Sequence, residues 1–158
     1  MERNSFSNLQ RTWRVIAIDT NILVYAHRKE MSHHSKAFQC IQLLAEGRKD
    51  WAIPWSCLHE FFAVVTHHKI FNAPTPHQKA IEQINHWMES PSLHLIHEGG
   101  GYWDILSKII ESGKIIGGMT HDARIAAICI QNDIDVLWSA DRDFSRISNL
   151  TIENPLLK

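Results

Sequence analysis

Residues 15–21 read Val-Ile-Ala-Ile-Asp-Thr-Asn, and this stretch decides the fold class. Its apolar part, residues 15–18, is too short for a helix and suits a strand that is buried on both faces. Strands of that kind occur in parallel sheets, because helices cover both faces of such a sheet. Asp19 ends the run, so we expect a carboxylate at the carboxyl end of this strand.

The rest of the chain alternates short apolar runs with amphipathic segments. Further strands are predicted at residues 51–53, 93–96, 135–138 and, less regularly, 150–152. Helical spacing of apolar residues predicts helices at 32–47, 56–68, 75–90, 102–113 and 120–130, with Ser32, Ser56, Thr75 and Thr120 as capping residues. Strands that alternate with helices indicate an α/β fold with a central parallel sheet of four to five strands and helices on both faces.

Length and composition indicate one ordinary globular unit. The 158 residues include 16 Lys and Arg against 17 Asp and Glu, a net charge of −1, so any polyanionic partner must be held by a local patch or through cations. Residues 1–14 are polar and are interpreted as a flexible N-terminal extension ahead of a domain at 15–158. Because no apolar run approaches the roughly 20 residues that span a bilayer, we expect no membrane association.

Cysteine usage and the N-terminus suggest the cellular compartment. Cys40, Cys57 and Cys129 are far apart in the chain and each has apolar neighbours, a pattern typical of reduced, buried thiols. The N-terminal segment has no apolar core of the kind that a secretory signal needs. We therefore expect a cytoplasmic protein.

Acidic residues recur where strands end and helices begin. Asp19 follows the first strand, and Asp141 and Asp143 follow the fourth, whereas Glu60 and Asp122 lie in first helical turns. Singly, each position has an ordinary structural explanation, since such acids favour turns and the positive end of a helix. Together they can point to one edge of a parallel sheet, where ligands of such folds bind. Carboxylates that converge there need cations, and their hard oxygen atoms suit Mg²⁺ or Mn²⁺, ions that also bind phosphate groups.

The sequence also resembles a known family. Residues 16–26, Ile-Ala-Ile-Asp-Thr-Asn-Ile-Leu-Val-Tyr-Ala, are similar to the opening motif of PIN-domain ribonucleases, especially the VapC-type toxins of bacterial toxin–antitoxin systems. Three further segments appear in the family's order: the helix that carries Glu60, residues 121–127 (His-Asp-Ala-Arg-Ile-Ala-Ala) and residues 139–144 (Ser-Ala-Asp-Arg-Asp-Phe). The resemblance extends from Arg14 to the C-terminus.

The resemblance implies a PIN-like α/β/α sandwich with the activity of an Mg²⁺- or Mn²⁺-dependent endoribonuclease. By the motif match, Asp19 and Asp122 would be the principal metal ligands, and Glu60 and Asp141 would complete a catalytic acidic quartet. It also implies a toxin that cleaves structured RNA such as tRNA or rRNA, a cognate antitoxin protein that blocks the acidic cleft, and a homodimer.

Some assignments stay open at this point. Asn21 and Ser139 match polar positions that support the acids in the family. Asp143 is held in reserve: it either completes the site or caps the turn before Phe144. Four cations near the same strand ends could hold RNA phosphates or be solvated surface charge: Arg28, Lys29, Arg142 and Arg146.

Two functional alternatives also remain. The first is a PIN-like nuclease that acts in RNA maturation or on structured DNA and has no toxin role. The second is a non-catalytic PIN domain that binds RNA, which the intact acidic set argues against.

Overall fold

A five-stranded sheet forms the centre of the computed structural model, which describes residues 13–158. All neighbouring strands are parallel, in the order β3-β2-β1-β4-β5. The strands are β1 Ile16–Ile18, β2 Trp51–Pro54, β3 Leu93–Ile96, β4 Val136–Trp138 and β5 Thr151–Glu153. The predicted parallel α/β sheet is therefore confirmed, with its fifth strand. The prediction of a flexible extension falls mostly on residues 1–12, which lie outside the described part.

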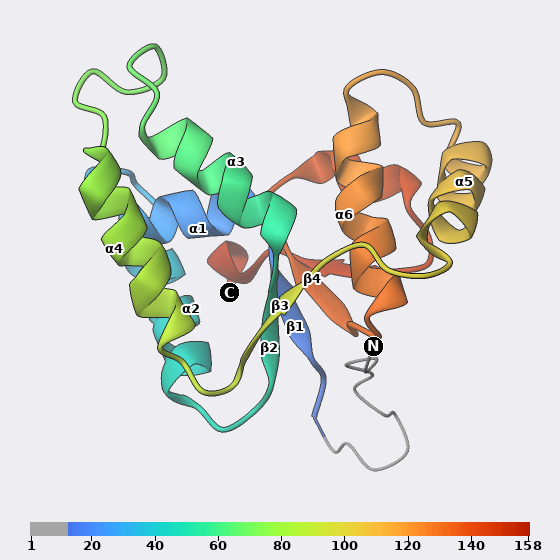
Figure 1. The fold of residues 1–158 in the computed structure, drawn as a ribbon, viewed down its shortest axis with the longest axis horizontal. Coiled ribbons are helices and arrows are strands. Elements are labelled where there is room, and N and C mark those ends of the chain that lie inside the picture. Colours follow the sequence, from blue (N-terminus) through green and yellow to red (C-terminus); the bar gives the residue numbers. More distant parts are fainter. Residues whose placement is uncertain (1–12) are drawn as a thin grey trace.

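Six helices cover the two faces of the sheet. Figure 1 shows four of them on one side, between β1 and β3 in the chain: α1 Thr20–His27, α2 His34–Glu46, α3 Trp55–Val65 and α4 His77–Met88. On the other side lie α5 Tyr102–Gly113 and α6 Met119–Gln131. This division follows from right-handed crossovers, because the first two connections step along the sheet in one direction and the third returns past β1. The three layers are those of the predicted sandwich.

Helix α1 is the element that the sequence pattern did not predict. It begins one residue after β1, and the Asp19 side chain accepts a hydrogen bond from the backbone N of Thr20 at 2.8 Å. Residues 20–27 are buried on most sides, so they lack the polar face from which an amphipathic helix is identified. The helix places Thr20 and Asn21 at the carboxyl end of the strand.

The predicted helix caps are wrong in detail. None of the helices α2, α3, α4 and α6 has a side-chain hydrogen bond at its N-cap, and their N-caps are His33, Pro54, Pro76 and Gly118. Ser56 and Thr120, which were predicted as caps, lie inside the first turns, each two residues after the observed N-cap. The Thr75 hydroxyl interacts instead with His27 and Arg28.

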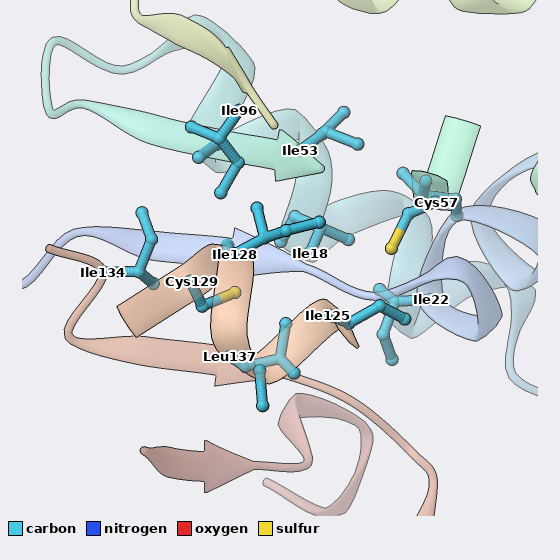
Figure 2. Packing of buried hydrophobic residues seen from close by; sticks show 14 of the residues in the cluster. Ile18, Ile22, Ile53, Cys57, Ile96, Ile125, Ile128, Cys129, Ile134 and Leu137 are labelled. Carbon is cyan, nitrogen blue, oxygen red and sulfur yellow. The ribbon is translucent and has the colours of Figure 1, made fainter. Parts of the chain in front are cut away.

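The core fills the space between the sheet and both helical layers. Ile18, Leu137 and Ile128 have no solvent exposure, and Figure 2 shows side chains of α6 lying against those of β1 and β4. Complete burial of such side chains supplies the main free energy that holds the layers together. None of the helices in residues 13–158 combines the length and apolar composition that crossing a bilayer requires.

The order in which strands are added to the sheet reverses between β1 and β4: β2 and β3 lie on one side of β1, and β4 and β5 lie on the other. These strands are neighbours in the middle of the sheet, with Ile18 opposite Trp138, and the backbone N of Asp19 donates to the carbonyl of Trp138 at 3.0 Å. The connection from β1 leads to β2 on one side, whereas the connection from β4 leads to β5 on the other, which opens a crevice at the carboxyl ends of β1 and β4. The fold thus brings the segments after β1 and β4 side by side.

Candidate active site

All four predicted acids line one cavity of about 350 Å³ at this crevice. Asp19 comes from the end of β1, Asp141 from the segment after β4, Glu60 from α3 and Asp122 from the first turn of α6. The cavity is also lined by Thr20 and Asn21 of α1, His121 of α6 and apolar residues that include Tyr25, Ile70 and Phe71. Residues more than 100 positions apart in the chain therefore face the same space.

Asp19 is the most buried acid of the cavity, with 4% of its surface exposed. Its Oδ2 accepts a hydrogen bond from Ser139 Oγ at 2.7 Å, and its Oδ1 accepts from the backbone N of Thr20 at 2.8 Å. The Cys57 thiol donates to the same Oδ1 at 3.7 Å. Three donors thus fix the carboxylate in one orientation. The sequence interpretation treated Cys57 as core packing only, and no spacing pattern linked its thiol to Asp19.

The segment after β4 is braced by side chains. Asn21 Oδ1 accepts from the backbone N of Ala140 at 3.1 Å, and Ser139 Oγ accepts from the backbone N of Asp141 at 3.0 Å. Asp141 Oδ1 in turn accepts from the backbone N of Asp143 at 2.8 Å and caps the 3₁₀ turn Arg142–Arg146. Asn21 and Ser139 therefore hold the segment that carries the acids. The turn is capped by Asp141, so Asp143 does not have the capping role considered for it.

Asp143 instead joins a compact group of carboxylates. Asp122, Asp141 and Asp143 each offer one oxygen, and these atoms all lie within 4.8 Å of one another. Asp143 is exposed, whereas Asp122 and Asp141 are half-buried. Glu60 lies outside this group; it is exposed and accepts a hydrogen bond from Thr20 Oγ1 at 3.1 Å. The Thr20 contact was not predicted, because it depends on the helix that the pattern missed.

Burial and mutual repulsion make the acids hold protons more tightly. Burial raises the pKa of Asp19 to about 6, and the charges of Glu60 and Asp141 act in the same direction, against the hydrogen bonds from Ser139 and Thr20. The pKa of Asp122 is also raised to about 6, first by burial and then by the charges of Asp141, Asp19 and Asp143. A positive charge in the cavity would relieve this repulsion.

The donor set of the cavity fits a hard divalent cation. Three carboxylate oxygens lie close enough to share one ion, and Asp19 and Glu60 add carboxylates to the same cavity. The neighbouring thiol does not compete, because complete burial raises the pKa of Cys57 well above its usual value and keeps it protonated. Oxygen ligands without thiolates suit Mg²⁺ or Mn²⁺ better than a soft metal ion.

Comparison with known proteins supplies independent information. A sequence model described as "PIN domain" matches residues 16–150. The chain is 30% identical over 142 residues to the VapC ribonuclease Mb2897 of Mycobacterium bovis, an alignment that covers 90% of this chain and 96% of the relative.

Solved structures agree on the fold. VapBC2 from Rickettsia felis, crystallised with a DNA fragment from its promoter, matches with a TM-score of 0.62 at 24% identity, covering 89% of this chain and 98% of the other. VapC20 from Mycobacterium tuberculosis, described as a toxin that cleaves the sarcin–ricin loop, matches with a TM-score of 0.59 at 15% identity, covering 82% and 92%. At these identities the likeness establishes the shared fold.

Proposed function

We propose that this chain, which belongs to the PIN domain family, is an endoribonuclease that depends on Mg²⁺ or Mn²⁺. We further propose that it is the toxin of a VapBC-type toxin–antitoxin pair. The observation that carries the proposal is the convergence of Asp19, Glu60, Asp122 and Asp141 on one cavity. Residues 15–158 would form the nuclease domain. The ribonuclease name of a relative aligned over nearly its whole length supports the same activity.

Asp122, Asp141 and Asp143 would hold one divalent ion, with Asp19 as the buried ligand beside them. When bound, such ions would supply positive charge that activates water as a nucleophile and stabilises the charge developing on the phosphodiester. Glu60, held by Thr20, would complete the acidic set from the α3 side of the cavity.

Protein groups outside the acidic set would prepare it for binding. Ser139 and Thr20 stabilise the ionised form of Asp19 by hydrogen bonds, so that the carboxylate can release its proton when a cation arrives. Asn21 fixes the backbone at Ala140 and thereby the position of Asp141. Because these hydrogen bonds exist before a ligand enters, little reorganisation is required at the moment of reaction.

The proposed partners follow from the family. The substrate would be structured RNA such as tRNA or rRNA, and a cognate antitoxin would cover the acidic cavity until it is released. We further propose a homodimer that acts in the cytoplasm, where Cys40, Cys57 and Cys129 would stay reduced, as they are in this structure.

The proposal is tested with purified protein and a matched pair of variants. Asp122→Asn keeps the side-chain volume but removes a carboxylate from the proposed site, whereas Asp104→Asn makes the same change on the exposed face of α5. Each protein is incubated with tRNA and rRNA in Mn²⁺, in Mg²⁺ and in EDTA. We expect metal-dependent cleavage by the natural chain and by Asp104→Asn, and none by Asp122→Asn. Undiminished cleavage by Asp122→Asn would contradict the assignment.

A further inference from the structure

A second cavity, of about 750 Å³, lies beside the acidic one. Two segments line it: residues 27–30, which begin with the last residue of α1, and residues 70–75, in the connection between α3 and α4. Ile70 and Phe71 line both cavities, so these two side chains form a shared wall. We call the second space the outer cavity and residues 70–75 the wall segment.

Arg28 fastens the wall segment to the end of α1. Its Nη1 donates to Thr75 Oγ1 at 3.1 Å, its Nη2 donates to the carbonyl of Ala73 at 2.8 Å, and its guanidinium lies 4.1 Å from the centre of the Phe71 ring. Glu30 completes the arrangement by an ion pair with Arg28. Because only 11% of the Arg28 side chain is exposed, this cation serves the wall and is not available as the surface phosphate contact that the sequence suggested.

The groups that remain available to a ligand at the wall are one exposed apolar side chain and two lysines. Ile70 is an apolar residue, yet 53% of its surface is exposed to solvent. Lys29 lines the outer cavity, Lys69 adjoins Ile70, and both lysines are exposed and form no ion pair with any residue of 13–158. The acidic residue among those that line the outer cavity, Glu30, is already paired with Arg28.

We propose that the outer cavity binds the RNA nucleotides next to the scissile phosphate, with an unpaired base against Ile70 and backbone phosphates near Lys29 and Lys69. The inference rests on the proposed function, because it assumes that the scissile phosphate enters the acidic cavity. A strand that continues from there meets the shared wall next. An exposed apolar side chain together with exposed lysines suits a strand in which flat bases alternate with phosphates. A purely acidic or a purely apolar peptide would use only one of these two features.

Binding experiments test the inference with two variants and two matched controls. The variants are the double replacement Lys29→Ala with Lys69→Ala, and Ile70→Ser. The controls are Lys108→Ala on α5, which Figure 1 places on the opposite side of the molecule from the α3–α4 connection, and Ile81→Ser, whose side chain is 48% exposed on α4. The probe is a labelled 20-nucleotide RNA of random sequence. Ca²⁺ replaces Mn²⁺ so that the RNA stays intact, which gel electrophoresis verifies.

The dependence of affinity on salt gives the sharpest readout. Removing two phosphate contacts to a single strand should lower the slope of log affinity against log salt concentration by about 1.4, a change that a loss of folding would not imitate. Ile70→Ser should weaken binding about fivefold with an unchanged slope, since it removes apolar contact and no charge. Both controls should stay within about twofold of the natural chain, and calorimetric Mn²⁺ binding should be the same in all five proteins.

The outcomes separate this inference from the proposed function. If the natural chain cleaves RNA in Mn²⁺ but the wall variants bind like their controls, the inference is wrong and the outer cavity serves another ligand, such as a protein. If the natural chain neither binds nor cleaves RNA, both proposals are overturned. A reduced slope for the lysine variant, together with weaker binding by Ile70→Ser, supports the inference.

Discussion

Replacing Asp19 by Asn should stabilise the metal-free protein at neutral pH, although Asp19 lies in the proposed active site. The pKa of Asp19 is raised from 3.8 to about 6, mainly by burial, so the folded chain binds this proton more tightly than the unfolded chain does. Stability from this group is therefore highest in acid and is lost as the pH rises from about 4 to about 6. Asn carries no charge at any pH and avoids this loss.

The pKa difference gives the size of the effect. The complete loss of unfolding free energy from ionising Asp19 in the folded chain is about 3 kcal/mol. About half of this loss has occurred at pH 5 and nearly all of it at pH 7.5. The advantage of Asp19→Asn over the natural chain should therefore grow by about 1.5 kcal/mol between these two pH values. A change in the hydrogen bonds from Ser139 and Thr20 would add a contribution to the unfolding free energy that is the same at both pH values. It would therefore not alter the increase of the advantage with pH.

Urea unfolding in EDTA at several pH values measures the difference directly. The control is Asp104→Asn, which removes an exposed carboxylate on α5 and should show no such pH-dependent gain. An Asp19→Asn variant whose advantage is flat or shrinks with rising pH would refute the reasoning. It would mean that Asp19 is not held in a site that disfavours its charge.

Three further predictions concern the support of the site and the core. Ser139→Ala removes the 2.7 Å hydrogen bond to Asp19 and should weaken Mn²⁺ binding about tenfold by calorimetry; unchanged affinity would exclude a role in orienting the carboxylate. Arg28→Ala leaves the buried Thr75 hydroxyl with fewer partners and should cost about 1–3 kcal/mol in urea unfolding, whereas no loss would show that the wall segment stands without it. Leu137→Ala opens a void in a strand with no exposure and should cost about 2–5 kcal/mol; a cost below about 1 kcal/mol would contradict the described packing.

The acidic site was predictable because its signal is local. An aspartate that follows a buried strand within a few residues lies near the carboxyl end of that strand. Asp19, directly after β1, and Asp141, three residues after β4, could therefore be assigned to one edge of the sheet from the sequence. The choice between Asp141 and Asp143 could not be made in this way. It depends on a 3₁₀ turn in which Asp141 caps the backbone and Asp143 still reaches Asp122.

Burial on several sides explains what the pattern missed in the fold. Helix α1 has apolar residues around most of its circumference, so the periodicity that indicates a helix at one face of a sheet is absent. In α6 the helical spacing of apolar residues predicts a buried stripe of Ala123, Ala126, Ala127 and Ile130. Ile125, Ile128 and Cys129 are buried as well, and Ile130 is only half-buried. A helix enclosed by the sheet and a neighbouring helix buries more than one stripe, and the sequence does not reveal which side faces solvent.

The central claim is that the acidic cavity cleaves RNA, and sequencing RNA ends in cells tests it most directly. Bacterial cells induced for the natural chain are compared with cells induced for Asp19→Asn, a variant expected to be folded. We expect new RNA ends at a few defined positions, in tRNA or rRNA, that appear with the natural chain and are absent with the variant. The same new ends in both samples, or none from a folded natural chain, would contradict it.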